Sequence, residues 1–290
     1  MSDRPRAWDR ALWAVALAFV AAEALGGFGL SALHQIVVGA LFLVLGLPHG
    51  ALDLALFRRG GGRASPLAFA LGYLAAAAVV AGAWVLAPGW TLAGFLAVSA
   101  WHLGESDFGR AGALRHALGL SRGIMVLGMP FLLHPAEVAA VLDAMGVGAP
   151  LGLGEGARGG VAALLVAQHG SLLLALSTRL DPAGLVHELL QGGVLGLTFA
   201  VLHPLLAFAL YFALWHAVAH LLASRRLLER EEAGALLARA APWAAAAMGL
   251  LGLALALGDG VGSLGAAAGP ALVLVSALTL GGVYAISAIG

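Results

Sequence analysis

Long apolar stretches follow one another along almost the whole chain, separated by short breaks that carry charged, glycine or proline residues. They cover residues 11–31, 34–57, 66–87, 91–108, 115–133, 160–178, 184–202, 204–223, 240–257 and 267–288. Each stretch is about 17–25 residues long, enough for a helix to cross the hydrocarbon core of a bilayer. The pattern predicts an all-α polytopic membrane bundle of about ten transmembrane helices, forming a single multi-pass domain over residues 1–290.

Only two connections between these stretches are long. The first covers residues 134–159, and the second, SRRLLEREEAGALLAR, covers residues 224–239. The second mixes acidic and basic residues with leucines, which favours an amphipathic helix at the membrane surface. We expect no soluble domain in either connection.

The composition agrees with a membrane protein. Of the 290 residues, 61% are hydrophobic and 10% are charged, and the mean hydropathy is +0.97. So few polar side chains cannot cover a water-soluble globule of this size. We therefore expect a multi-pass protein of a cell membrane, with the bacterial inner membrane as its location and lipid as its surroundings. The formal net charge of zero argues against nucleic acid as a partner.

Two residue types are missing, and each absence excludes a kind of chemistry. All fifteen basic residues are arginine, so no lysine can form a Schiff base with an aldehyde such as retinal. The chain is therefore not itself a rhodopsin. It also has no cysteine, which excludes disulfides, iron–sulfur clusters and thiolate ligands. Any bound metal must be held by histidines and carboxylates.

The arginines predict the orientation of the chain. If the segments alternate across the membrane from a cytoplasmic N-terminus, fourteen arginines fall on the cytoplasmic side: Arg4, Arg6, Arg10, Arg58, Arg59, Arg63, Arg110, Arg115, Arg122, Arg179, Arg225, Arg226, Arg230 and Arg239. Only Arg158 falls outside. By the positive-inside rule, this distribution predicts an even number of spans with both termini cytoplasmic.

Four histidines share one predicted depth in the membrane. His49, His102 and His216 each precede an arginine at the inner end of a helix by eight or nine residues, which places them roughly 12–14 Å from the cytoplasmic edge. His220 follows His216 by four residues and therefore lies on the same helix face. Each histidine alone would more often be a packing residue, but a shared layer of four imidazoles indicates a metal site. Without sulfur ligands, such a site suits iron or zinc.

Two carboxylates lie beside these histidines in the sequence. Asp53 follows His49 by four residues, and Glu105 follows His102 by three. Both are placed to accept the second ring proton of a ligating histidine, which fixes the tautomer and raises its basicity. Direct ligation by Asp53 is the alternative. Pro48 either shapes the site at His49 or is an ordinary transmembrane kink.

The other histidines give weaker signals. His34, His134 and His203 fall at outer helix ends, where imidazoles at the headgroup level need no ligand. His116 lies near an inner end. His187 belongs to HELLQ, in which Gln191 replaces the second histidine of a zinc-protease motif, so that chemistry is not supported. His169 lies deep in a predicted helix and has no explanation from the sequence.

Small residues four apart allow helices to approach closely. The pairs Gly46/Gly50 and Gly192/Gly196 have this spacing. With 42 glycines in the chain, such spacings also arise by chance, so they carry little weight.

Four motifs, in this order, resemble the Brp/Blh family of membrane β-carotene dioxygenases. They are GLPHGALD, SAWHLGESDF, PFLLHP and YFALWHAVAHLL, within residues 40–225. The resemblance implies cleavage of β-carotene by O2 at non-haem Fe(II) into two retinals, which typically supply a rhodopsin. It further implies that His49, His102, His216 and His220 are the iron ligands, all within residues 46–220.

The expected substrate fits a membrane site. An all-trans carotenoid is nearly as long as the hydrocarbon core is thick, about 30 Å, so a spanning molecule has its central double bond near the midplane. Aromatic residues that flank the histidines could line its path, although packing between helices is the more common role for any single one of them. These candidates are Trp101, Phe108, Tyr211, Phe212 and Trp215.

Other function classes account for fewer of the observations. A transporter coupled to protons or divalent metals would also carry buried histidines and acids, but no second copy of PHGALD or WHAVAH indicates repeated halves. A membrane di-iron desaturase needs about eight histidines in several clusters, including adjacent HH pairs that this chain lacks, and four ligands suit one iron rather than two. A non-enzymatic carotenoid or rhodopsin accessory protein would not require all four histidines.

Overall fold

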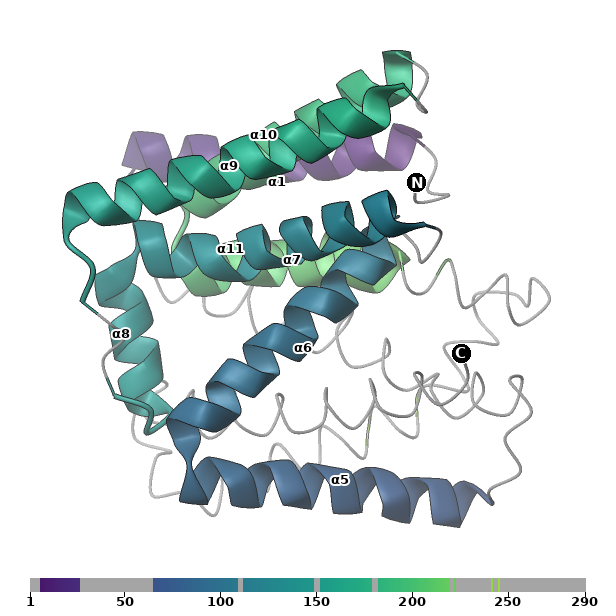
Figure 1. Cartoon of the computed structure of the whole chain (residues 1–290), viewed down its shortest axis with the longest axis vertical. Helices are drawn as coiled ribbons and strands as arrows, with labels where there is room; N and C mark the ends of the chain where they lie inside the picture. The colour runs from purple at the N-terminus through teal and green to yellow at the C-terminus, as the bar shows by residue number, and fades with distance from the viewer. Residues whose placement is uncertain are drawn as a thin grey trace. The chain divides into compact units, whose positions relative to one another are not determined.

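The structure is a computed structural model, and it describes residues 6–26, 65–108, 112–148, 152–178 and 182–219, together with three isolated positions beyond them. These residues form helices and short connections (Figure 1). The helices are α1 (Arg6–Gly26), α5 (Pro66–Leu86), α6 (Pro88–Phe108), α7 (Ala113–Leu133), α8 (Pro135–Ala144), α9 (Glu155–Ser177), α10 (Pro182–Val201), α11 (Pro204–Leu210) and the π-helix η2 (Tyr211–Ala217).

Prolines mark where many of these helices begin. The first residues of α5, α6, α8, α10 and α11 are Pro66, Pro88, Pro135, Pro182 and Pro204. Proline suits the first helical position because its fixed φ is helical and its missing N–H would have no helical partner there. At α5, the side chain of Ser65 completes the start by accepting a hydrogen bond of 3.1 Å from the backbone N–H of Ala68.

Most of the predicted spans in the described part of the chain contain a helix with similar bounds. The stretch 66–87 is α5, and the stretch 115–133 lies within α7. The first helix differs, because α1 begins at Arg6 rather than near residue 11. The connection 134–159 is not simply a loop, since it holds α8. The stretches 34–57 and 267–288, and the predicted surface helix at 224–239, lie outside the described residues. The stretch 240–257 also lies outside them, apart from two isolated positions.

Four of the described helices are long and apolar enough to cross a membrane. They are Leu67–Leu86, Ala113–Leu133, Glu155–Ser177 and Pro182–Val201. The protein is therefore an integral membrane protein, as the composition predicts. The total of about ten spans and the cytoplasmic location of both termini remain predictions.

The chain divides into two compact units. In its described part, the first unit contains α1, α6 from Ser99 onward, α7, the start of α8, α9, α10, α11 and η2. Within it, α7 packs against α9 and α10, and α10 also packs against α1 (Figure 1). The second unit contains α5, the first half of α6 and the rest of α8.

A large apolar core and a smaller cluster around Leu118 lie in the first unit. The fully buried members of the large core come mainly from α1, α7 and α10, and from the segment between residues 202 and 215. In the most apolar part of α7, 44% of the residues are buried, against 22% in α9. We infer that α7 is an internal helix, whereas much of α9 faces lipid. The central position of α7 makes it the support for the sites described next.

Candidate functional site

The structure brings two of the four predicted metal ligands together. His102 lies on α6 and His216 on η2, and both belong to the first unit. Their ring centroids are 5.2 Å apart, and the ring planes make an angle of 70°. His216 is completely buried, and His102 is partly exposed. Residues 114 positions apart therefore present two imidazoles to each other inside a membrane bundle.

This geometry fits two ligands of one metal ion. A ligating imidazole nitrogen lies about 2 Å from the metal, so two nearly perpendicular rings on one ion have centroids on the order of 5 Å apart. His49, Asp53 and His220 lie outside the described residues, and only the backbone of Glu105 is described. Within the part that the structure describes, no three histidine or acidic side chains gather as a metal site. The pair is thus half of the predicted ligand set.

His216 is positioned by an irregular helix that the sequence did not predict. The chain starts α11 at Pro204 and then widens into the π-helix η2 before His216. The side chain of His203 caps the start of α11, where its Nδ1 accepts from the N–H of Leu205 at 3.3 Å. The ring of Phe212 stacks on that of His216, with centroids 5.3 Å apart and planes 27° apart. π-helical turns inside α-helices occur frequently at functional sites.

His102 is positioned by a close backbone contact between α6 and α7. A Cβ atom added at Gly119 would lie 2.6 Å from the carbonyl oxygen of Gly104, and one added at Gly123 would collide with the backbone of Ala100. Only glycine at these positions allows the helices to lie this close. The spacing Gly119/Gly123 is the signal that sequence analysis missed.

The glycine pairs singled out in the sequence behave differently. At Gly192 and Gly196, an added Cβ would have no heavy atom of the described residues within 4 Å, so this pair marks no close contact among them. Gly46 and Gly50 lie outside the described residues.

The predicted lining residues fall into distinct environments. Tyr211 and Trp215 have no exposed surface and belong to the apolar core. Trp101 is partly exposed, and Phe212 lies against His216. The side chain of Phe108 is not among those described.

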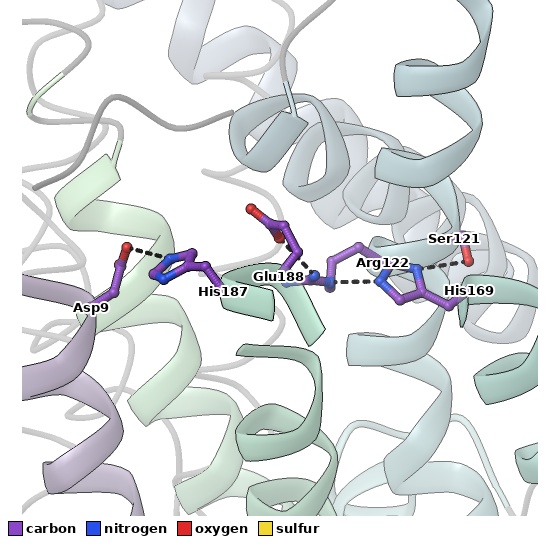
Figure 2. A network of polar contacts seen from close by, with 6 residues as sticks. All are labelled: Asp9, Ser121, Arg122, His169, His187 and Glu188. Carbon is purple, nitrogen blue, oxygen red and sulfur yellow. Dashed lines mark hydrogen bonds and ion pairs between the residues drawn. The ribbon is translucent and has the colours of Figure 1, made fainter. Parts of the chain in front are cut away.

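A second polar cluster joins α7, α9 and α10 (Figure 2). Arg122 Nη2 lies 3.4 Å from Glu188 Oε2, and Arg122 Nε donates to His169 Nε2 at 3.3 Å. His169 Nδ1 lies 3.1 Å from Ser121 Oγ, which in turn donates to Gln168 Oε1 at 3.4 Å. Because Nε2 of His169 accepts from a guanidinium, its ring proton lies on Nδ1 and is donated to Ser121. The hydrogen bonds therefore run in one direction from Arg122 to Gln168.

This cluster corrects one prediction and explains one residue. Arg122 is 1% exposed and lies nine residues inside α7, so it is not an exposed charge at the end of a helix. The physical reason is Glu188, which supplies the opposite charge that an arginine needs at this depth. His169, which the sequence left unexplained, is the partner between Arg122 and Ser121.

His187 takes part in a different helix contact. Its Nε2 lies 3.0 Å from Asp9 Oδ2 (Figure 2). Its ring centroid lies 5.0 Å from that of Trp13. In HELLQ, adjacent residues thus serve separate purposes: His187 joins α10 to α1, and Glu188 joins it to α7. This agrees with the prediction that HELLQ is not a zinc-protease motif.

The histidines predicted at helix ends bind the backbone there. His134 follows α7, and its Nε2 donates to the carbonyl oxygen of Phe199 at 2.9 Å. That carbonyl belongs to the last turn of α10, where backbone carbonyls have no hydrogen-bond donor within the helix. His34 lies outside the described residues.

Comparison with known proteins gives one finding. The model of the family described as "Beta-carotene 15,15'-dioxygenase" matches residues 40–287 of this chain, well over half of its length. The match continues past residue 225, where the motifs found in the sequence end. No curated protein and no solved structure showed a significant similarity to the chain.

Proposed function

Because the chain belongs to the beta-carotene 15,15'-dioxygenase family, we propose that it cleaves the central double bond of β-carotene at a histidine-bound ferrous ion within the membrane. In the overall reaction, one carbon–carbon double bond breaks, and each of its two carbons receives one oxygen atom from O2. The products are two molecules of retinal. The observation that carries the assignment of the site is the pair of rings His102 and His216, whose centroids are 5.2 Å apart.

In this proposal, His49, His102, His216 and His220 hold the iron. Neutral imidazoles without sulfur suit Fe(II) and leave coordination positions open. When bound, the ion supplies the electrons with which O2 can react with an alkene. Asp53 and Glu105 orient the ligating rings by accepting their second N–H protons.

The membrane helices supply an apolar setting for the substrate. A carotenoid dissolves in the bilayer, so we propose that it enters from lipid and lies beside the histidines along aromatic side chains. The proposed lining residues are Trp101, Phe108, Tyr211, Phe212 and Trp215. Retinal then leaves into lipid or to a retinal-binding rhodopsin, and we place the protein in the bacterial inner membrane.

The test is expression of the full chain in bacterial cells that make β-carotene, followed by measurement of retinal and of iron in the purified protein. We expect retinal from the wild type, and a loss of at least about 100-fold in His102→Ala and His216→Ala, because metal-site substitutions cost about that much. Iron content should fall in both variants.

A matched control is His116→Ala, which removes an exposed histidine on α7. It should leave retinal and iron at wild-type levels. Retinal formation that persists in iron-free His216→Ala would contradict the ligand assignment. An inserted wild-type protein that leaves β-carotene intact would contradict the proposed reaction itself.

A further inference from the structure

Three flat rings form a column on one helix. The ring of Phe208 stacks on that of Phe212, with centroids 5.9 Å apart and planes 22° apart. Phe212 then stacks on His216 at 5.3 Å and 27°. The ring of His102 lies next to His216, with its centroid 5.2 Å from that of His216 and its plane at 70° to it. The column therefore leads directly to the proposed iron site.

The π-helix is what aligns these rings. In a regular α-helix, each residue turns by about 100°, so residues eight apart are offset by about 80° around the axis. The wider turns of a π-helix, with i→i+5 hydrogen bonds, rotate less per residue and offset that drift. Because η2 begins at Tyr211, between Phe208 and Phe212, all three rings stay in one stack. The structural consequence of the π-helix is therefore the alignment of these three rings.

The column differs from the aromatic residues next to it. Tyr211 and Trp215 have no exposed surface and form part of the core. Phe208 and Phe212 are partly exposed. The same helix thus carries two fully buried rings and two partly exposed rings beside His216.

We propose that Phe208 and Phe212 form the wall along which one half of the polyene lies, and that this wall determines which double bond reaches the iron. The inference rests on the proposed function and adds Phe208 and the choice of bond to it. A polyene that runs along the column meets the edges of the stacked rings, and the positive edge of an aromatic ring packs well against the face of a conjugated chain. The column covers eight residues, on the order of 12 Å, which is close to half of a carotenoid about 30 Å long. A wall of that length contacts half of the polyene, from its end to its central double bond, and so fixes which bond lies at the iron.

The experiment compares Phe208→Ala and Phe212→Ala with the wild type, using the full chain with iron bound. The readouts are the ratio of retinal to longer apocarotenals, the separate kcat and KM for β-carotene, and the iron content. We expect normal iron, and the proportion of off-centre cleavage products to rise about tenfold, since loss of hydrophobic contacts of this size weakens discrimination by that order. Phe208→Leu and Phe212→Leu serve as milder variants if the alanine variants do not fold.

The matched control is Phe199→Leu, which changes a core phenylalanine of α10 outside the column. It should keep the wild-type product ratio even if it lowers stability. Iron-loaded Phe208 and Phe212 variants that give only retinal, with wild-type KM, would overturn the inference.

A second readout separates this inference from the proposed reaction. Carotenoid retained by the purified protein is measured by its visible absorbance, and it should fall about tenfold in the Phe208 and Phe212 alanine variants but not in Phe199→Leu. If the wild type binds the carotenoid without cleaving it, the proposed reaction is wrong, but the proposed role of Phe208 and Phe212 in holding the polyene is not contradicted. If the wild type forms retinal, and the Phe208 and Phe212 variants bind and cleave the carotenoid as the wild type does, only the proposed role of these two phenylalanines is wrong.

Discussion

Two buried histidines of the first unit have very different neighbours. His169 lies between the guanidinium of Arg122 and the hydroxyl of Ser121, so both of its ring nitrogens take part in hydrogen bonds. The ring of His216 stacks on that of Phe212 and lies at a steep angle to that of His102. Both side chains are almost inaccessible, so burial alone does not distinguish their roles.

The difference teaches what a buried histidine can do. A metal ligand must offer a nitrogen lone pair, and the Nε2 lone pair of His169 already accepts from Arg122. That histidine joins helices. His216 instead faces a second imidazole at a distance that suits a shared ion. The two histidines are therefore distinguished by their partners rather than by their burial. His169 is the joining histidine, which links helices, and His216 is the proposed metal ligand.

The largest expected effect comes from breaking the ion pair at the joining histidine. Arg122→Met leaves the Glu188 carboxylate buried without its guanidinium, and removing one partner of a buried pair costs about 3–5 kcal/mol. Urea or thermal unfolding of the purified protein in detergent measures the loss. Retinal formed per folded molecule should stay unchanged.

The double variant Arg122→Met/Glu188→Leu removes both charges and should recover most of that stability, because a well-packed apolar pair can replace a buried ion pair. Equal stability of the single and double variants would show that the pair does not hold α7 to α10.

The second-largest expected effect tests the comparison of His216 with His169 directly. His216→Ala should lower bound iron and retinal by about 100-fold. His169→Ala should lower the free energy of unfolding by about 1–3 kcal/mol, because Arg122 and Ser121 lose a partner, and should leave iron per folded molecule at the wild-type value. Metal analysis beside the unfolding curve gives both numbers. The comparison fails if His169→Ala loses iron as completely as His216→Ala.

A smaller effect is expected where α6 and α7 touch. Gly123→Ala places a methyl group against the backbone of Ala100, two residues before His102, and overpacking of this kind costs about 1–3 kcal/mol. Both stability and iron binding should fall, because α6 must move. The control Gly192→Ala has open space around the new Cβ and should be neutral or stabilising by about 0.5–1 kcal/mol. Identical behaviour of the two variants would argue against the close contact.

Much of the helical architecture follows from the sequence for a physical reason. Lipid offers no hydrogen bonds, so an apolar run of sufficient length must be a helix, and prolines then fix where several helices begin. Distances counted from arginines at helix ends also placed His102 and His216 at one depth, and the structure brings these two together. The ligand roles of all four histidines remain predictions.

Pairings across the fold could not be predicted from the sequence. Arg122 and Glu188 are 66 residues apart, and periodicity within one helix carries no information about a partner on another. Arg122 was therefore placed at the surface by a rule that treats every arginine as a loop charge. The π-helix was missed because its register depends on the packing of the helix, while its residues read as an ordinary apolar run.

The smallest expected effect concerns the remaining polar link, between α1 and α10. His187→Phe keeps a ring against Trp13 and removes the nitrogen that lies 3.0 Å from Asp9. One hydrogen bond is lost, so the free energy of unfolding should fall by about 1 kcal/mol. Because this link joins α10 to α1 and involves neither α6 nor η2, iron content and the ratio of cleavage products should not change. Asp9→Asn is the matched variant, since it retains an oxygen acceptor for His187 and should cost less than His187→Phe. If His187→Phe instead abolished iron binding while the protein remained folded, His187 would belong with His216 rather than with His169, and the distinction between joining histidines and proposed ligands would have to be redrawn.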